Sequence, residues 1–297
     1  MFGVEVAIGL CLIPASESIF HPRSPITRKL RRKQPTQIPD YLSYVPKMEN
    51  ANFLKLLFIR HAQSVGNQQH RMEGLADSEL SQAGKIQAEK LAQRLRQEFW
   101  RPSHIYCSPL ERAAQTLEIL LAPYGIGPSA ISPAHSGVDL APILRVGSDS
   151  SAHSPLVLRF AAELQEFQNG VFRGLTWAEA KVRYPNLCKT LESSLDWIPI
   201  PEAESLPAGR DRACRFVQHL LTHHKNGDGL WIISHSWILE HLIAVLLGCD
   251  RTWKIQIPNT ALFEFWLDRS RWRQTEQNCF NSELWRIQRF QDYQHLD

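Results

Sequence analysis

Two apolar segments that each lead into a histidine place the strongest constraint on this chain. Residues 54–59 form a nearly continuous apolar run that ends in Arg60 and His61, and residues 230–234 form a second run that ends at His235. Runs of this length that stop at polar residues are typical of buried strands. In an open parallel sheet, ligands bind where the strands end. We therefore expect both imidazoles at one edge of one sheet, where two rings and a cation suit a phosphoryl group.

Each of these histidines also has a plainer interpretation. The Arg60-His61 pair can be the polar exit of a strand, and His235 can be a core histidine whose ring is satisfied by a backbone carbonyl. Two strands that end in the same way are harder to explain by those interpretations, because the same sheet edge would receive both rings.

Strand-like and helix-like segments alternate along the chain. Ser81 can cap a helix whose apolar residues recur at helical spacing up to Phe99, and Pro123 ends another helix. Thr176 and Glu179 predict a capping box at the start of a third. The predicted strands cover residues 54–59, 104–107, 155–160, 230–234, 261–267 and 284–290, and the later predicted helices cover 110–122, 212–223 and 237–247. This alternation indicates an α/β fold with a parallel sheet.

The composition is that of a globular chain. The 297 residues are 43% hydrophobic and 21% charged, which is enough for one large domain or two small ones with a sizeable core. No run approaches about 20 apolar residues, so we expect no membrane partner. The six cysteines include no C-x-x-C pair, and the apolar start of the chain lacks a basic segment. We therefore expect reduced thiols and a cytoplasmic location.

The basic charge is concentrated before the first predicted strand. Residues 1–50 hold seven Lys and Arg against four Asp and Glu, a net charge of +3 that equals the charge of the whole chain. This segment could bind nucleic acid or anionic lipid, but its Pro, Ser and Gln content favours a mobile, solvated extension outside the fold. The neutral remainder argues against a nucleic-acid-binding enzyme. We expect residues 51–297 to form a single domain, with an insertion or cap at about 123–155, where Pro, Gly, Ser and Ala accumulate.

Two further segments carry residues suited to phosphoryl chemistry. Arg112 lies in the first turn of a predicted helix, where backbone N–H groups favour an anion and a guanidinium adds a bidentate fork. Glu166 follows a predicted strand beside a turn that contains two glycines. Taken alone, Arg112 can be an exposed cation paired with Glu111 or Glu118, and Glu166 can be an exposed acid of a loop.

Taken in order, these segments resemble the histidine phosphatase superfamily, which includes cofactor-dependent phosphoglycerate mutases and fructose-2,6-bisphosphatases. The resemblance runs from about residue 54 to about residue 267. It depends on Arg60-His61-Ala62 with Ser64 and Asn67, on Leu80-Ser81-Gln82-Ala83-Gly84, on residues 108–116, 164–174 and 232–235, on Glu204-Ser205 and on Asn259-Thr260. It implies a three-layer α/β/α sandwich around a mostly parallel, phosphoglycerate mutase-like sheet.

The resemblance also implies a role for each candidate residue. His61 would be the nucleophile that forms phosphohistidine, Glu166 the general acid, and His235 a catalytic neighbour of the transferring group. The phosphoryl group would be bound by Arg60, Asn67 and Arg112. The two arginines would supply the charge that Mg²⁺ supplies in other phosphoryl-transfer enzymes, so we expect no metal and no cofactor.

The leading hypothesis is a metal-independent phosphomonoesterase that hydrolyses a small phosphorylated metabolite. A cofactor-dependent phosphoglycerate mutase is one alternative, although only about 38 residues separate Glu166 from Glu204, and such mutases usually carry a longer segment there. A non-catalytic phospholigand-binding protein is another. Its motivation is Ala62, where the family has Gly, because a methyl group there could crowd a phosphoryl oxygen. The sequence specifies neither the phosphoester nor the oligomeric state.

Overall fold

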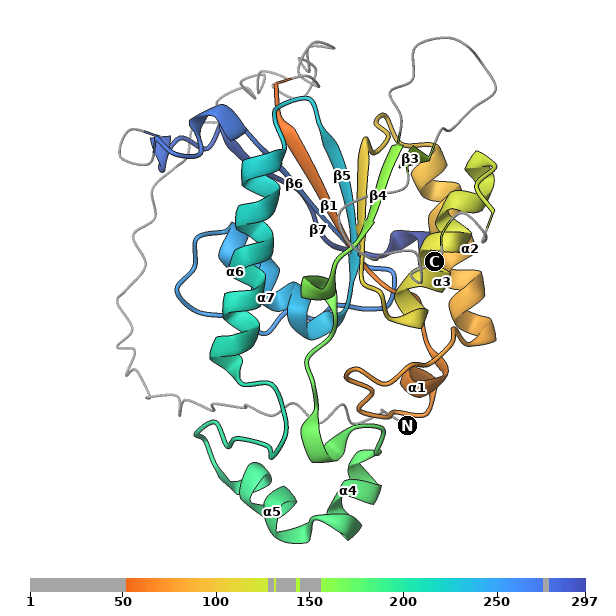
Figure 1. The fold of residues 1–297 in the computed structure, drawn as a ribbon, viewed down its shortest axis with the longest axis vertical. Coiled ribbons are helices and arrows are strands. Elements are labelled where there is room, and N and C mark those ends of the chain that lie inside the picture. The colour runs from red at the N-terminus through yellow and green to blue at the C-terminus, as the bar shows by residue number, and fades with distance from the viewer. Residues whose placement is uncertain (1–51, 128–130, 132–142, 145–155, 275–277) are drawn as a thin grey trace, which may run out of the picture.

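The computed structural model describes residues 52–127, 131, 143–144, 156–274 and 278–297. A seven-stranded sheet in the order β3-β4-β2-β5-β1-β6-β7 forms the centre of the molecule (Figure 1). The expected extension at residues 1–50 and most of the expected insertion at 123–155 lie outside the described residues.

The sheet is mixed, with a parallel centre. Its strands are β1 (Leu54–Arg60), β2 (His104–Cys107), β3 (Ile143–Leu144), β4 (Leu156–Phe160), β5 (Gly229–Ser234), β6 (Leu262–Leu267) and β7 (Trp285–Asp292). The neighbours β4, β2, β5 and β1 run parallel, whereas β3, β6 and β7 pair antiparallel toward the two edges. The carboxyl ends of four strands therefore meet at one edge, which is the arrangement that the alternating sequence pattern predicts.

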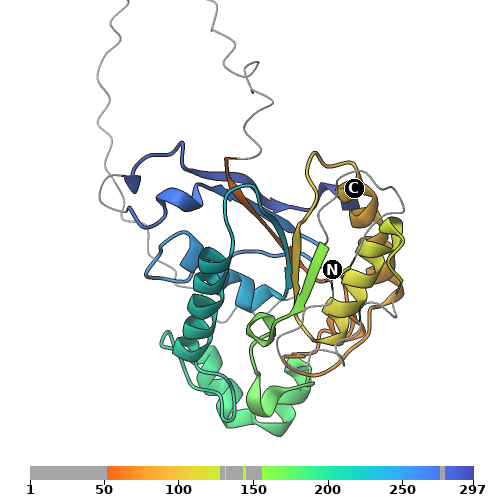
Figure 2. The ribbon, with the colours of Figure 1, turned by 45° about the horizontal axis from the view of Figure 1, so that its top comes forward.

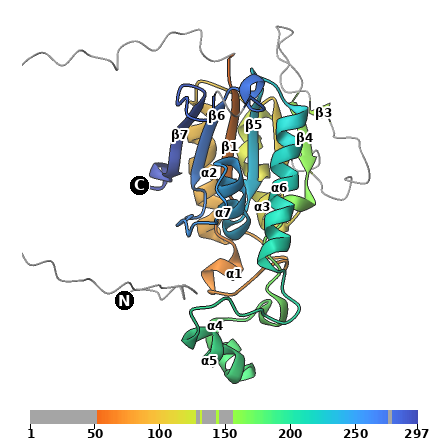
Figure 3. The same cartoon turned by 90° about the vertical axis from the view of Figure 1, so that its left-hand side faces the viewer.

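Helices cover both faces of this sheet and extend beyond its carboxyl edge. They are α1 (Val65–Gln68), α2 (Gln82–Arg96), α3 (Glu111–Leu121), α4 (Trp177–Arg183), α5 (Pro185–Ser193), α6 (Leu206–His223) and α7 (Ser236–Leu246). Helices α2 and α3 lie on one face, and α6 and α7 lie on the other (Figures 1 and 3). The pair α4 and α5 lies beyond the edge to which the parallel strands point, with a small core of its own (Figure 2).

The residues of β1 show how the sequence builds the three layers. Leu56 and Phe58 belong to the core shared with α6 and α7, whereas Leu57 and Ile59 belong to the core shared with α2 and α3. Side chains of a strand alternate between faces, so a continuous apolar run buries both sides of a central strand.

Most predicted helix starts are confirmed, but the start predicted at residue 212 is wrong, because α6 begins at Leu206 after the cap Ser205. Ser81 caps α2, and Thr176 with Glu179 forms the capping box of α4. Phe99, predicted to extend the apolar face of α2, lies beyond the end of that helix and is 97% exposed. Helix α5 was not predicted; Pro185 occupies its first turn, where a missing N–H group costs no intrahelical hydrogen bond.

The segment after β6 packs on the body and contains the strand predicted at residues 284–290. Strand β7 pairs with β6, and Arg289 forms ion pairs with Glu98 of the loop after α2 and with Glu264 of β6. Across the described residues, we find no helix whose length and apolar character would allow it to cross a bilayer.

Candidate active site

The parallel pairing of β1 with β5 brings His61 and His235 together. Arg60 lies opposite Ser234 in the register, and the N–H group of His61 donates to the carbonyl of Ser234 at 2.9 Å. The two histidines follow these partners at the same level of the sheet. Their ring centroids lie 4.8 Å apart, and both rings are buried.

The backbone fixes which nitrogen of His61 is free to react. Nδ1 lies 2.7 Å from the carbonyl oxygen of Ala62, so it carries the proton and donates it to that carbonyl. The lone pair is therefore on Nε2. Burial, followed by the charges of Arg112 and Arg60, holds the pKa of His61 well below its usual range. The ring is thus neutral and suited to nucleophilic attack at physiological pH.

The side chain of Ala62 points away from the site, contrary to the concern raised by the sequence. Its methyl group is buried with Leu80 and Ala88, and Ile119 packs against them. The Ala62 N–H donates to the hydroxyl of Thr116 at 3.0 Å. The methyl group therefore contributes to packing between the turn after β1 and helices α2 and α3.

Arg112 is held rigidly in the first turn of α3. The side chain is 1% exposed, and its Nη1 and Nη2 donate to the carbonyls of Ala76 and Gly74 at 2.8 and 2.7 Å. Its Nε lies 3.2 Å from Nδ1 of His235 and donates to it. Arg60, at the end of β1, donates through Nη1 to the carbonyl of Ile257. The charges of both guanidinium groups act on the two rings.

His235 is oriented by contacts on both of its nitrogens. Because Nδ1 accepts from Arg112, Nε2 carries the proton, and it lies 2.7 Å from the hydroxyl of Ser108 at the end of β2. Burial, followed by the charges of Arg112 and His61, holds the pKa of His235 well below its usual range. Three neighbouring strands thus contribute side chains to one site.

Glu166 lies against the N-terminus of α7. One carboxylate oxygen accepts from the N–H groups of Phe167 and Ile238, and the other accepts from the N–H of Trp237 and the hydroxyl of Ser236, at 3.0 to 3.3 Å. A helix N-terminus favours negative charge at this point. The arrangement places a carboxylate directly next to the strand that delivers His235.

An arginine that the sequence analysis did not consider positions this carboxylate. Arg212 of α6 donates through Nη1 to the carbonyls of Glu163 and Gln165, at 2.7 and 2.6 Å, and pairs with Glu204 at 2.7 Å. The turn that carries Glu166 is therefore tied to the start of α6. Glu204 was matched to the family pattern, but no role followed from the sequence.

Asn67 does not point a free amide at the rings. Its Nδ2 donates to Oε2 of Glu73 at 2.8 Å, and its Oδ1 accepts from Asn259 at 3.0 Å. The predicted contact of Asn67 with a phosphoryl oxygen would therefore use the second N–H of Nδ2 or follow a displacement of Glu73.

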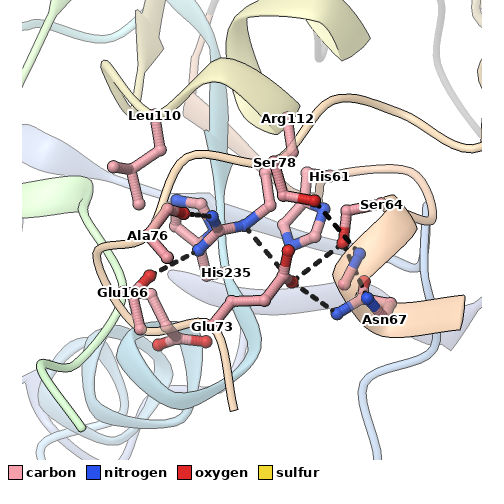
Figure 4. A network of polar contacts seen from close by, with 12 residues as sticks. His61, Ser64, Asn67, Glu73, Ala76, Ser78, Leu110, Arg112, Glu166 and His235 are labelled. Carbon is pink, nitrogen blue, oxygen red and sulfur yellow. Dashed lines mark hydrogen bonds and ion pairs between the residues drawn. The ribbon is translucent and has the colours of Figure 1, made fainter. Parts of the chain in front are cut away.

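Glu73 is the second residue that sequence reasoning missed. Its Oε2 also accepts from the hydroxyl of Ser64 at 2.8 Å and lies 3.9 Å from Nε of Arg112. Its Oε1 is buried and has no hydrogen-bond partner among the described residues. Figure 4 shows the carboxylate directed toward Arg112, Ser64 and Asn67. It thus occupies donors that an incoming anion would use. No signal identifies it in the sequence, because it lies in a polar loop without periodicity.

Comparisons with known proteins agree with the fold. The family model of the histidine phosphatase superfamily, branch 1, matches residues 56–133 and 150–279. The chain is 27% identical to phosphoglycerate mutase-like protein 4 of Arabidopsis thaliana, over 84% of this chain and 90% of that protein. It is 26% identical to phosphoserine phosphatase 1 of Hydrogenobacter thermophilus, over 70% and 84%. The structure is similar to that of the α-ribazole phosphatase of Shigella flexneri, with a TM-score of 0.55, 20% identity and coverage of 81% and 97% of the two chains.

Proposed function

Because the chain belongs to the histidine phosphatase superfamily, we propose that it is a metal-independent phosphomonoesterase that acts on a small phosphorylated metabolite through phosphohistidine at His61. The observation that carries this proposal is the pair of buried, neutral rings, 4.8 Å apart, beside the guanidinium groups of Arg60 and Arg112. A phosphomonoester carries close to two negative charges at neutral pH. Cations fixed around its oxygens therefore stabilise both the bound substrate and the transition state.

The first step transfers the phosphoryl group to His61. The lone pair on Nε2 attacks phosphorus, the N–P bond forms, and the bond from phosphorus to the leaving oxygen breaks. Arg60 and Arg112 face the charge that spreads over the remaining phosphoryl oxygens. His235, whose Nε2–H contacts Ser108 in the free enzyme, can turn this N–H toward one of those oxygens. The supply of charge by these residues removes the requirement for a metal ion in this step.

The second step returns the phosphoryl group to water. We assign Glu166 to proton transfer in both directions: it protonates the leaving oxygen in the first step and takes a proton from the attacking water in the second. Since both carboxylate oxygens accept hydrogen bonds in the free enzyme, delivery of a proton requires Glu166 to give up at least one of these contacts.

Substrate binding also requires a change at Glu73. Its carboxylate accepts from Ser64 and Asn67 and lies beside Arg112, so it competes with an incoming dianion for the same donors. Displacement of this side chain would free the amide of Asn67 for a phosphoryl oxygen. The binding free energy of the substrate is then the difference between two interactions with the same donors: that of the phosphoryl group and that of the Glu73 carboxylate which it displaces.

A phosphoglycerate mutase is the second candidate. It is favoured by the similarity to a phosphoglycerate mutase-like protein of Arabidopsis thaliana. The hydrolase and the mutase share the first step and differ in what removes the phosphoryl group from His61. A phosphomonoester panel that includes phosphoglycerates, assayed in the presence of EDTA, separates them: the hydrolase releases inorganic phosphate, whereas a mutase interconverts positional isomers and releases little.

The decisive variant is His61→Ala. Removal of the nucleophile should lower the rate of phosphate release by about 10⁴-fold or more, because no other described side chain has the position of its Nε2. Acid-labile incorporation of ³²P into the wild type, absent from the variant, would identify the intermediate. His223→Asn, an exposed position of α6, is the matched control. Full activity in His61→Ala would contradict the mechanism.

A further inference from the structure

A second cluster of histidines lies at the opposite edge of the sheet. His104 begins β2, His224 follows the last residue of α6, and Asp228 directly precedes β5. One donor atom from each of these three side chains lies within 4.8 Å of the other two. The ring centroids of His104 and His224 are 4.5 Å apart. The active site is built where β2 and β5 end, so this cluster is separated from it by the length of both strands.

Neighbouring groups leave one nitrogen of His104 free. The hydroxyl of Ser103 donates to the carbonyl of Gly229, so it accepts from the ring nitrogen Nδ1 that lies 2.9 Å away. The proton of the neutral ring is then on Nδ1, and Nε2 keeps its lone pair. Among the described residues, this Nε2 makes no hydrogen bond. A histidine whose other N–H is held by a neighbouring oxygen is oriented as metal-binding histidines are.

His224 is the centre of a chain of hydrogen bonds that can run in two directions. Its Nε2 lies 2.9 Å from the hydroxyl of Tyr106, which lies 3.3 Å from Nε2 of His219, while its Nδ1 lies 3.3 Å from Oδ2 of Asp228. With a proton on Nδ1, His224 donates to Asp228. With the proton on Nε2, it donates to Tyr106, and the lone pair of Nδ1 then faces the carboxylate oxygen. Two acceptors face each other favourably only when a cation lies between them.

We propose that His104, His224 and Asp228 bind a divalent transition-metal ion, with Zn²⁺ as the preferred ion and water in the fourth position. Two imidazole nitrogens and one carboxylate oxygen, with one open position, form a donor set that Zn²⁺ accepts. Zinc bonds of about 2.0–2.1 Å in a tetrahedron place donors about 3.3 Å apart. The three donors must therefore approach one another, which the partly exposed side chains of His104 and Asp228 allow.

Protonation and charge favour a cation here. Burial, followed by the charge of His104, lowers the pKa of His224 to about 4, and burial lowers the pKa of His104, so that both rings are neutral at pH 7. Metal ions bind the neutral form of histidine. The positive charge of Arg159 opposes binding from one side, since it acts on His104. Asp228 therefore supplies the negative charge on which the affinity depends.

An ion at this point would join three elements that lie far apart in the sequence. It would hold the start of β2, the end of α6 and the residue before β5 together at the amino edge of the sheet. Its expected effect is on stability and not on the phosphoryl transfer proposed for the other edge.

The test measures zinc binding by the full-length, tag-free protein after removal of metal with EDTA. Equilibrium dialysis against Zn²⁺ should find one site whose Kd rises at least tenfold in His104→Asn and in Asp228→Asn. Zinc at a free concentration about 100-fold above Kd should raise the Tm of the wild type by about 5 to 10 °C. His223→Asn, on the exposed face of α6, should retain both effects.

Further variants make the result decisive. His61→Ala should bind zinc as the wild type does; loss of the site in this variant would place the ion at the active-site histidines and overturn the proposal. Unchanged zinc binding in Asp228→Asn would overturn it as well. Asp228 is partly exposed, so this variant tests the site even if His104→Asn fails to fold. Because phosphate release is assayed separately with EDTA present, failure of either proposal leaves the other standing.

Discussion

The two edges of the sheet each hold a pair of histidines, and their surroundings differ in charge. At the carboxyl edge, the rings of His61 and His235 lie 4.8 Å apart beside Arg112 and Arg60. At the amino edge, the rings of His104 and His224 lie 4.5 Å apart beside Asp228. Burial lowers the pKa of all four rings, so all four are neutral near pH 7.

The charge of the neighbouring side chain therefore decides what each pair can bind. In the two proposals, guanidinium groups make the first pair a site for an anion, and a carboxylate makes the second a site for a cation. Glu73 complicates this contrast, because it places one carboxylate among the cations of the carboxyl edge.

Of three changes to these two edges, replacement of Arg112 should have the largest effect, because it removes a cation from the carboxyl edge. Arg112→Gln removes the charge that faces the transferring group, and kcat/KM for phosphate release should fall by about 10²- to 10³-fold. Arg112→Lys keeps the positive charge but loses the planar, two-pronged guanidinium, so its kcat/KM should fall less than that of Arg112→Gln. The Tm of each variant, measured in parallel, separates catalysis from stability. If Arg112→Gln keeps wild-type kcat/KM, the carboxyl edge does not depend on this cation.

Replacement of Glu73 should have a smaller effect of opposite sign. Glu73→Gln removes the negative charge that competes with the substrate, so the Ki for inorganic phosphate should fall by about 3- to 30-fold. Inhibition kinetics measure this directly. Glu283→Gln, whose side chain is 80% exposed, is the matched control and should leave Ki unchanged. A Ki that stays constant or rises in Glu73→Gln would show that Glu73 does not compete with the anion.

The pH dependence of stability should show the smallest of these effects. The pKa of His224 is about 4 in the folded protein, below the value of about 6.5 in the unfolded chain, so the unfolded chain takes up the proton first as the pH falls. The contribution of neutral His224 to the free energy of unfolding is complete above pH 6.5 and is lost as the pH falls from about 6.5 to 4. In His224→Gln, the slope of unfolding free energy against pH should fall by up to about 1.4 kcal/mol per unit in this window. Urea unfolding at several pH values measures it, with His223→Gln as the control. An unchanged slope would mean that His224 is not held neutral by the fold.

Sequence reasoning was most successful for strands and helix starts. The apolar runs before His61 and His235 predict β1 and β5, and the edge at which they end follows from the alternation of strands and helices. Ser81 and Thr176 predict the starts of α2 and α4, because a side-chain cap is a local interaction. These features depend on neighbours within a few residues.

The features that were missed depend on contacts between distant segments. The role of Glu73 depends on its contacts with Arg112 and Asn67. The role of Arg212 depends on its hydrogen bonds to carbonyls of the turn before Glu166. The cluster of His104, His224 and Asp228 is likewise assembled by the order of the strands. Periodicity and motif spacing contain no information on such contacts.

The position of β5 between β2 and β1 has a consequence for synthesis on the ribosome. More than half of the chain separates Arg60 from Ser234, its partner in the register, so β1 leaves the ribosome long before β5 exists. Until then, a nascent chain exposes two apolar strands that cannot pair with each other in the native order, and such edges invite aggregation. Premature termination before β5 would therefore yield an aggregation-prone fragment without activity, and not a partly active enzyme.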